Sequence, residues 1–521
     1  MITFGAARRA TAGPRHAHTV REQSARSCLD GGDAARRDHH GAETACPVGR
    51  SSRRVGRASA IRSYDARMEN ADTPVPVPAG LVLAPVRAAR FPVSGAALAA
   101  RTSPPYDVID DAERASLWQR DEHNVVRLIL PGDDYDSADR LLREWLDTGV
   151  LLRDETASLH VCEEEQDGHV QRGLIGAVAL ADPEAGIILP HENTMTGPVT
   201  DRLALTRATR ANLEPIFLLY AGGGETSRVV AELVTTPARV ETTTDDGVTH
   251  RLWTIDDPAV LATVAADLLP RHAVIADGHH RYATYRQYQA ERHAAGDGPG
   301  PWDFGLAFLV DATVSGPRVH AIHRAVAGLR LDDAVRRAAA AFSVRHLAGP
   351  DTARVEASGA GAPVRTPGIG IATGIGRASS AAVDPRRLLE MLADAGRDGH
   401  AFAVTDGVSA YLLSEPSPEL LARSLPAQRS AAFRRLDVTV AHLALIVDVW
   451  GLADTVEVVG YHHDAAAAIA AAAAGGGTAL LLNPTPVTDV TAVAEAGERM
   501  PRKSTLFTPK PRTGLLLRPL D

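Results

Sequence analysis

The chain has 521 residues, of which 45% are hydrophobic and 23% charged, and these values are ordinary for a globular protein of two to four domains. Residues 1–67 carry 13 arginines and 6 acidic residues, so within a total net charge of −9 the other 454 residues carry −16. Such an acidic body disfavours nucleic-acid partners. No apolar run approaches the roughly 18 residues of a membrane span, and three cysteines without metal-ligand spacing indicate a reducing, cytoplasmic setting.

Residues 1–67 are rich in arginine, alanine, glycine and serine and show no sustained helical or strand period. The acidic residues within this segment argue against a transit peptide, and the lack of an apolar stretch argues against a secretory signal. We therefore expect a disordered basic extension that buries no apolar face. The alternative is a start codon assigned too early, with Met68 as the true first residue.

Helical and strand patterns alternate over residues 68–330, which we expect to form an N-terminal α/β domain. Asp-Gly pairs at 167–168 and 246–247 each separate two strand-like segments and predict hairpins. Hairpins combined with helix–strand alternation favour a mixed α/β (α+β) fold. The expected helices lie at 110–120, 136–149, 199–212, 258–269 and from 279 or 280 onward, and the expected strands include 124–130, 215–220, 273–276 and 304–310.

The pattern loosens after residue 330. Residues 345–385 are rich in glycine, alanine, proline and threonine and predict a variable loop region. Helix–strand alternation returns at 437–451, in the alanine-rich run 465–474 and at 478–497. We therefore expect a further α/β region over 331–521.

The most informative motif is AVIADGHHRYATYRQY, at residues 273–288. A short apolar strand ends there at an Asp-Gly pair, and a helix begins directly afterwards. Free backbone amides and the positive end of the helix dipole favour an anion, and an arginine in the first turn strengthens that preference. The alternative is an ordinary helix start with surface histidines. The residues expected to hold a phosphate are Gly278, His279, His280 and Arg281.

A second polar motif reads LPHENTMTGPVTDRLALTRATRANLEPIFLLY. His191 and Glu192 lie in its polar loop, and Arg202, Arg207 and Arg210 follow on a predicted helix. Positions 207 and 210 share one helix face, so the two arginines can converge on a substrate carboxylate or phosphate. The alternative is a solvated basic face that pairs with the acidic body.

A third motif, TSPPYDVID, presents a carboxylate on a stiff loop. Pro104 and Pro105 favour an extended approach to Tyr106 and Asp107. A carboxylate held in this way suits a general base or a metal ligand. The alternative is a turn that leads into a helix cap.

The chain has only two lysines, Lys503 and Lys510, against 53 arginines. Both lie in the segment GERMPRKSTLFTPKPRTG. A lysine ammonium is a compact point charge that suits phosphate oxygens, so this clustering indicates a function. We expect Lys503 to fold back onto the turn at 277–281. The alternative is a charged C-terminal tail.

Other sites are weakly indicated. His320 and His323, and the adjacent His462 and His463, lack a carboxylate or cysteine partner at ligand spacing, so no zinc site is expected. No haem or flavin is expected either. The sequence lacks a Walker-type phosphate loop, the protein-kinase signature set and the G-x-S-x-G nucleophile motif.

Several long motifs occur together and in one order: SPPYDVI, NVVRLILP, the HENTMTG segment, IADGHHRYATY, LLNPTP and GERMPRKST. From about Leu81 to Asp521 the chain therefore resembles the uncharacterised prokaryotic family called "domain of unknown function 1015". The DGHHR box is also similar to the phosphate-binding box of the ParB/sulfiredoxin superfamily, whose members include free-serine kinases. This second resemblance implies a ParB/sulfiredoxin-like nucleotide-binding core. It implies further that Gly278 to Arg281 hold ATP phosphates and that Asp277 assists Mg²⁺ or the acceptor hydroxyl.

Together these features predict an ATP- or ADP-dependent kinase of a metabolite hydroxyl, with free L-serine as the best candidate. Asp107 or Glu192 would accept the hydroxyl proton, His191 and the helix arginines would bind the substrate, and Lys503 would bind phosphate beside Mg²⁺. Two alternatives stay open. One is a nucleotide-binding regulatory module without turnover, and the other is a metal-assisted hydrolase that uses the DGHHR box. The oligomeric state is left open.

Overall fold

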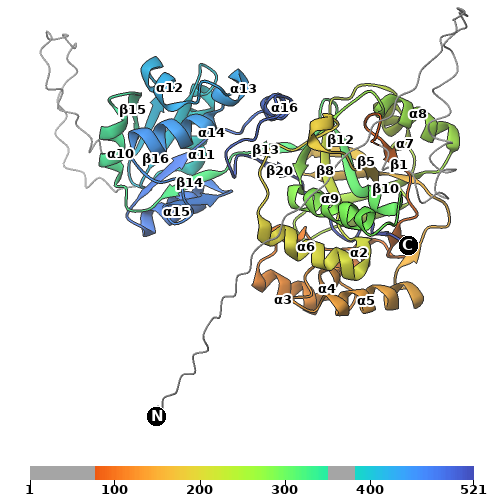
Figure 1. Cartoon of the computed structure of the whole chain (residues 1–521). Coiled ribbons are helices and arrows are strands. Elements are labelled where there is room, and N and C mark those ends of the chain that lie inside the picture. The colour runs from red at the N-terminus through yellow and green to blue at the C-terminus, as the bar shows by residue number, and fades with distance from the viewer. Residues whose placement is uncertain (1–76, 350–381) are drawn as a thin grey trace, which may run out of the picture. The chain divides into compact units, whose positions relative to one another are not determined.

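The structure is a computed structural model that describes residues 77–349 and 382–521. All of these belong to one compact unit, Asp65–Asp521. The predictions about residues 1–67, and most of the predicted loop at 345–385, fall outside the described residues. The mixed α/β fold expected from the sequence is confirmed by two large mixed or antiparallel sheets with helices packed on them (Figure 1).

A nine-stranded sheet forms the centre of the part of the chain that precedes residue 320, counted over the described residues. Its order is β6-β11-β8-β12-β5-β4-β10-β9, with β1 paired to β5. The pairs β8–β12 and β6–β11 are parallel, and the others are antiparallel. The strands are β1 (Leu83–Ala84), β4 (Leu159–Gln166), β5 (His169–Ala179), β6 (Ile188–Leu189), β8 (Ile216–Tyr220), β9 (Val240–Thr243), β10 (Thr249–Ile255), β11 (Ala273–Asp277) and β12 (Phe304–Asp311).

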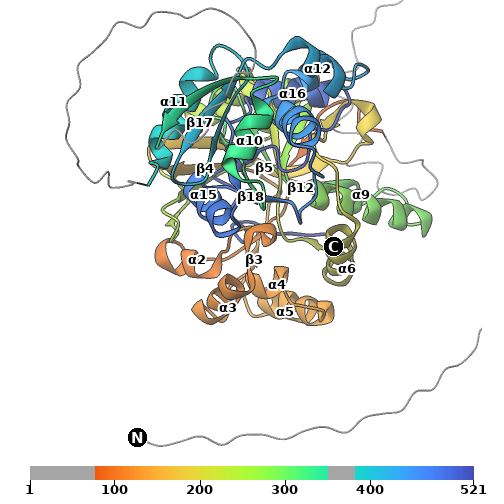
Figure 2. The ribbon, with the colours of Figure 1, turned by 90° about the vertical axis from the view of Figure 1, so that its left-hand side faces the viewer.

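The helices of this region pack around that sheet, and α3, α4 and α5 lie together in one layer in both ribbon views (Figures 1 and 2). The long helices α6 and α9 pack against each other. The helices are α2 (Gly95–Arg101), α3 (Asp111–Arg120), α4 (Val126–Ile129), α5 (Tyr135–Asp147), α6 (Thr196–Thr209), α7 (Glu225–Leu233), α8 (Pro258–Leu268) and α9 (His279–Ala294), with 3₁₀ turns at η1 (Tyr106–Val108), η2 (Pro183–Ala185) and η3 (Pro301–Asp303).

One predicted element is wrong: the strand predicted at 124–130 is absent, and Val126–Ile129 within it form the short helix α4. Asn124 explains the difference, because its side-chain oxygen accepts the Val126 N–H at 2.9 Å, as a helix-starting residue does. Its side-chain amide also donates to the carbonyls of Ala100 and Thr102. A short apolar run that is buried all round carries no period that distinguishes a helix from a strand.

A second, six-stranded antiparallel sheet follows in the described residues, in the order β15-β17-β16-β19-β14-β18. Its strands are β14 (His323–Val326), β15 (Ser343–Ala348), β16 (Ala401–Thr405), β17 (Ala410–Ser414), β18 (Val459–His462) and β19 (Thr478–Leu481). Its helices are α10 (Leu331–Ala338), α11 (Pro385–Ala395), α12 (Pro418–Ser424), α13 (Ala431–Arg434), α14 (Asp437–Thr439), the π-helix η4 (Val440–Val449), α15 (Ala465–Ala474) and α16 (Val487–Glu495).

The end of the chain returns to segments that precede residue 321 and pairs with them outside the nine-stranded sheet. The strand β20 (Leu506–Thr508) pairs with β13 (Arg318–His320), and β21 (Arg518–Pro519) pairs with β7 (Ala211–Asn212). Backbone bonds also join Thr513 to Ser103 and Leu517 to Ala89. A further short pair joins β2 (Ala89–Arg90) to β3 (Leu152–Arg153). This return carries residue 510 to the end of β11, more than 230 positions earlier in the sequence.

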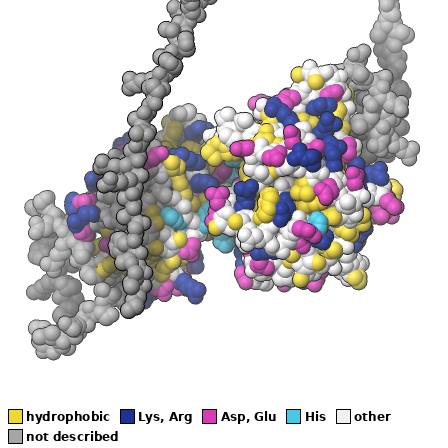
Figure 3. Space-filling model, turned by 90° about the horizontal axis from the view of Figure 1, so that it is seen from below, with side chains coloured by type: hydrophobic (Ala, Val, Ile, Leu, Met, Phe, Trp, Pro, Cys, Tyr) yellow, Lys and Arg dark blue, Asp and Glu magenta, His cyan; other side chains and the backbone are white. Residues whose placement is uncertain are grey.

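Charged side chains are distributed over the surface, and basic and acidic groups are interspersed on the face drawn in Figure 3. Over residues 77–349 and 382–521, no helix has both the length and the apolar character that crossing a bilayer requires.

Candidate functional site

The site is built on the sharp turn between β11 and α9. Residues 273–276 are buried, as a fully covered strand requires, and the pairing of β11 with β8 shifts register between Ile275 and Asp277. Gly278 then adopts a left-handed φ of +90°, which glycine tolerates best. A Cβ at this position would lie 3.0 Å from Nε of Arg281, so any other residue would also crowd that side chain. Among the described residues, no side chain caps the start of α9.

Lys510 brings a positive charge to this turn from the end of the chain. Its Nζ lies 2.6 Å from Asp277 Oδ1 and 3.5 Å from both carboxylate oxygens of Asp107. Burial acts to lower the pKa of Lys510, but the two carboxylates outweigh it, so the net shift is upward. Burial likewise acts to raise the pKa of Asp277, but Lys510 and Arg281 lower it to about 2. The sequence reasoning singled out both lysines but committed to Lys503, so it missed this contact of Lys510.

Arg281 lies beneath the turn and does not face solvent. Its side chain is 3% exposed and binds Asp277 and the Pro215 carbonyl oxygen. Glu214, which is also buried, faces the same guanidinium, and burial raises the pKa of Glu214 even though Arg281 and Arg202 act to lower it. Arg281 is therefore the counter-charge of two acidic groups. A phosphate-binding role for Arg281 stays a prediction.

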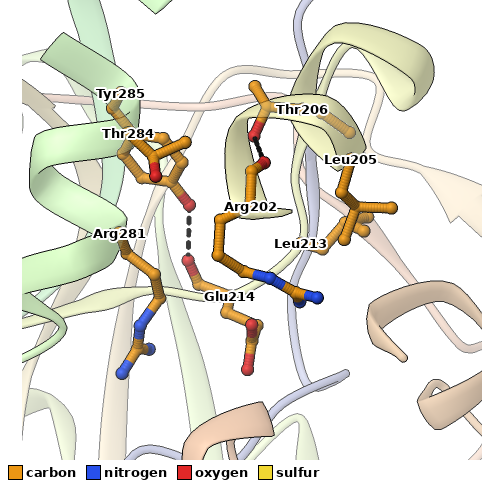
Figure 4. Close-up of a pocket in the computed structure, with 9 residues that line it drawn as sticks. Arg202, Leu205, Thr206, Leu213, Glu214, Arg281, Thr284 and Tyr285 are labelled. Carbon is orange, nitrogen blue, oxygen red and sulfur yellow. Dashed lines mark hydrogen bonds between the residues drawn. The ribbon is translucent and has the colours of Figure 1, made fainter. Parts of the chain in front are cut away.

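A small cavity beside this charged cluster has a volume of about 20 Å³. Its lining includes Arg202, Glu214, Arg281, Thr284 and Tyr285, and the Glu214 side chain lies between the two arginines (Figure 4). About 10–15 Å³ holds one water molecule, so the cavity is far too small for a nucleotide. No sequence pattern singles out Glu214, since an acidic residue beside an apolar strand is not recognisable as buried.

The histidines of the site accept hydrogen bonds from the backbone. Nε2 of His279 accepts the N–H groups of His191 and Glu192 at 3.2 and 3.3 Å, and Nε2 of His280 accepts that of Met195 at 3.0 Å. Burial lowers the pKa of His279 and of His280. Both imidazoles are thus neutral and hold the 191–195 loop against α9, and their binding of phosphate stays a prediction.

His191 is fully buried between β11 and the C-terminal segment. Its Nδ1 lies 2.7 Å from the Ile275 carbonyl oxygen, and its Nε2 lies 3.1 Å from the Thr505 hydroxyl. Burial lowers the pKa of His191 to about 4. The ring therefore acts as a neutral link in which Nδ1–H donates and Nε2 accepts. His191, which the sequence predicted to bind the substrate, is 0% exposed and therefore offers a substrate no surface.

Glu192 is the titratable carboxyl of the site whose pKa fits acid–base work at neutral pH. Partial burial raises its pKa to about 7, and the positive charge of Lys503 limits the rise. Its side chain is 29% exposed, so a substrate can reach it. A general base is most effective when its pKa lies near the working pH.

The three arginines of α6 do not converge on one ligand. Arg202 is buried, stacks 4.4 Å from the Tyr106 ring centroid and binds Asp201 and the Ile129 carbonyl. Arg207 forms a surface ion pair with Glu291 at 2.6 Å. Arg210 ends the helix with a left-handed φ of +48° and is exposed. Substrate binding by these arginines stays a prediction that their separate positions do not favour.

Arg207→Ala is expected to change the free energy of unfolding by less than about 1 kcal/mol, as the loss of an exposed ion pair usually does. Its partner Glu291 follows the first residue of α9 by 12 positions, or about 18 Å along the helix axis. The KM for an acceptor should therefore stay unchanged. Urea unfolding and steady-state kinetics measure both quantities, and a KM raised tenfold or more would restore the role predicted from the sequence.

Comparison with known proteins identifies one family. The model of the family described as "Protein of unknown function (DUF1015)" matches residues 83–439. No curated protein matches the chain. Among solved structures, a free serine kinase in complex with AMP aligns with 13% identity and a TM-score of 0.30, covering 63% of this chain and 88% of that chain.

Two further solved structures align at a similar level. A conserved hypothetical protein from Pyrococcus furiosus gives 12% identity, a TM-score of 0.28 and coverage of 62% of this chain and 88% of that chain. SbnI with a C-terminal truncation, from Staphylococcus aureus, gives 9% identity, a TM-score of 0.28 and coverage of 66% and 87%. Likenesses with such TM-scores are too weak to bear on what this chain does.

Proposed function

Since the chain belongs to the DUF1015 family, whose description states no activity, we propose from the site itself that it is an ATP-dependent kinase of a hydroxyl group on a small polar metabolite. Free L-serine is the acceptor to test first, because of the resemblance of the DGHHR box. The observation that carries the proposal is the Lys510 ammonium, which lies between Asp277 and Asp107 at the uncapped start of α9.

The position of Lys510 would let a phosphate replace the Asp107 carboxylate as one of its two anionic partners. Its contacts with Asp107 are long, at 3.5 Å, and the Asp107 side chain is 31% exposed. The shorter contact with Asp277 fixes the ammonium at the turn, where free amides and the helix dipole also favour an anion. A phosphate oxygen could thus replace Asp107 without the loss of the Asp277 contact.

Glu192 supplies the base that the transfer needs. In the proposed step, Glu192 accepts the proton of the acceptor hydroxyl while the hydroxyl oxygen bonds to the γ-phosphorus. The bond from that phosphorus to the ADP oxygen breaks, and ADP leaves with the electron pair. Phosphoryl transfer depends mainly on positioning and on neutralisation of negative charge, and Lys510 supplies that neutralisation on the phosphate oxygens.

The carboxylates at this turn suit Mg²⁺ delivered with the nucleotide. Mg²⁺ usually takes only one or two protein carboxylates together with phosphate oxygens and water. Asp107, once a phosphate oxygen has taken its place on Lys510, could supply one of these carboxylates, because its side chain is 31% exposed. When bound, Mg²⁺ would neutralise charge on the transferred phosphoryl group. The described residues contain no group of three or more His, Cys, Asp or Glu side chains placed to hold a metal ion.

The test is acceptor-dependent turnover by the full chain with Mg²⁺ and ATP. Amino acids, sugars and polyols that carry a hydroxyl are supplied singly, and the products are identified by mass spectrometry. We expect one acceptor class to gain a phosphoryl group with equal release of ADP; ADP as donor, with release of AMP, is tested in parallel. Nucleotide binding without any acceptor-dependent product would instead indicate a regulatory module and would overturn the kinase proposal.

A further inference from the structure

Two polar side chains lie fully buried opposite each other in the nine-stranded sheet. Glu164 of β4 and Gln171 of β5 are register partners, and both are 0% exposed. Directly opposed residues of an antiparallel pair present their side chains to each other on one face of the sheet, and Nε2 of Gln171 donates to Oε2 of Glu164 at 2.5 Å. His250 of β10 is the register partner of Glu164 on its other side, with Nδ1 3.3 Å from Oε1. Buried polar groups are costly unless partners satisfy them, so the further bonds of this pair indicate what it does.

Both members of the pair also bind the backbone on either side of Lys510. Nε2 of Gln171 donates to the Pro509 carbonyl oxygen at 3.2 Å, and Oε1 of Glu164 accepts the Arg512 N–H at 3.4 Å. Both protons of the Gln171 amide are thus used, and this fixes the orientation of the amide, because its oxygen would otherwise face two acceptors. The pair therefore holds the chain one residue before and two residues after the lysine.

The same segment is fastened to the loop that carries Asp107. Arg512 is 7% exposed, and its Nε and Nη2 donate to the hydroxyl and the carbonyl oxygen of Thr102, both at 3.2 Å. Thr513 and Ser103 exchange two backbone hydrogen bonds, at 3.0 and 3.1 Å. Because Ser103 lies only four positions before Asp107, the lysine segment and the Asp107 loop are held together.

We infer that Glu164 and Gln171 are positioning residues for Lys510, which hold its backbone so that the ammonium reaches Asp277. A lysine carries its charge on a flexible four-carbon stem. Bonds on both sides of residue 510 fix where that stem begins, and the 2.6 Å contact with Asp277 fixes where it ends. The sheet itself does not need the polar pair, because two apolar side chains of the same shape would pack there about as well. The inference rests on the proposed function only for what the ammonium does to a phosphate.

The test is the reactivity of Lys510 toward a trace of acetic anhydride, measured on the full chain by mass spectrometry. The chain has only two lysines, so the exposed Lys503 serves as an internal reference. The Lys510 side chain is 17% exposed and is paired with Asp277, and acylation needs a free, unprotonated amine. In Gln171→Met, we expect the ratio of Lys510 to Lys503 labelling to rise at least about fivefold, because the loss of one hydrogen bond typically raises the population of a released state by that factor.

A second variant and a control keep this result specific. Glu164→Gln preserves the side-chain volume and serves if Gln171→Met fails to fold. It replaces one of the two acceptor oxygens by an NH₂ group, so the bond from Gln171 or from Arg512 is lost and the labelling ratio should rise in the same direction. The control is Gln289→Met, which removes another buried glutamine that donates to a carboxylate, that of Asp303 at 2.8 Å, and it should leave the ratio unchanged. An unchanged ratio in folded Gln171→Met, or in folded Glu164→Gln, would overturn the inference.

Kinetics separate this positioning role from the kinase proposal. In an enzyme that phosphorylates an acceptor, Gln171→Met should lower kcat/KM, but its addition to Lys510→Met should cause no further loss, since residues that act through one group are not additive. A further tenfold loss in the double variant would show that Gln171 acts independently of Lys510 and would also overturn the inference. A raised labelling ratio in a protein that phosphorylates no acceptor would uphold the positioning role and reject the kinase.

Discussion

Lys510→Met is expected to lower kcat/KM by about 100-fold or more, in the range found when one charge-stabilising donor is removed from an active site. Lys510 is bound to Asp277 at 2.6 Å and is the ammonium nearest the proposed phosphate position. Without it, an incoming phosphate would meet the carboxylates of Asp277 and Asp107 with no cation between them and the phosphate oxygens. Steady-state kinetics on the acceptor identified by the turnover screen measure the loss.

The variant should keep its fold, because Asp277 retains Arg281 as a counter-charge and Asp107 is partly exposed. Lys510→Arg should rescue only part of the activity, since a planar guanidinium does not reproduce a compact ammonium. Arg228→Met is a matched control that removes one exposed charge from α7, and it should behave as the wild type. A Lys510→Met enzyme with unchanged kcat/KM would show that Lys510 does not contact the reacting phosphate.

Acidification from about pH 6.5 to pH 4 is expected to destabilise the fold strongly. Burial lowers the pKa of His160, His191 and His323 to about 4, and that of His279 is also lowered. At these four rings the unfolded chain binds protons over this window that the folded chain does not, whereas the raised pKa values of Glu192 and Glu214 act in the opposite direction. The rings outnumber these two carboxyls, so the free energy of unfolding falls as the pH falls. For one fully buried histidine such as His191, a pKa lowered from 6.5 to about 4 corresponds to a loss of about 3 kcal/mol in the free energy of unfolding at pH 4.

The loss from even two such histidines is comparable with the whole stability of many domains. Urea-unfolding midpoints at pH 7.5, 6 and 5 measure it, and the midpoint should fall at each step. His191→Gln, whose amide can both donate and accept, should lower stability at pH 7.5 but flatten the pH dependence. A midpoint that stays constant between pH 7.5 and 5 would contradict the buried neutral state of these rings.

Local patterns in the sequence predicted much of the first sheet. The Asp-Gly pairs do form the turns of the β4–β5 and β9–β10 hairpins, and the apolar runs before Tyr220 and Asp277 are buried strands. These features depend on residues close together in the chain, so composition and period reveal them. The short helix α4 was missed because its cause is the side chain of Asn124 and not a period.

Which charged side chains of the site pair with one another could not be predicted from the sequence. The sequence predicted Arg281, at the start of a helix, to be an anion ligand. A residue with that role alone could be replaced by alanine without loss of the fold. In the structure, Arg281 compensates Asp277 and the buried Glu214, which lies 67 positions earlier in the chain. Its removal would leave Asp277 with only Lys510 and Glu214 with only Arg202 as a counter-charge. The loss of one partner from a buried ion pair typically costs about 3–5 kcal/mol. Fold stability is therefore at risk in this variant.

The scarcity of lysine in the sequence predicted only part of what the structure shows for Lys503 and Lys510. Their clustering pointed to the segment that holds Lys510, but which lysine reaches Asp277 depends on the pairing of the C-terminal residues with segments before residue 213. That pairing places Lys510 on Asp277, whereas the charge of Lys503 acts on Glu192 and His280. No local pattern in the sequence encodes such a long-range pairing.

Calorimetric titration of the full chain with a non-hydrolysable ATP analogue and Mg²⁺ tests most directly whether the Asp277 turn binds nucleotide phosphate. The wild type should bind the analogue, and Lys510→Met should weaken the affinity at least about tenfold, or about 1.4 kcal/mol, while a thermal melt shows that the fold is retained. Arg228→Met should bind as the wild type does. Absence of binding by the wild type, or an equal affinity in folded Lys510→Met, would contradict a phosphate site at this turn.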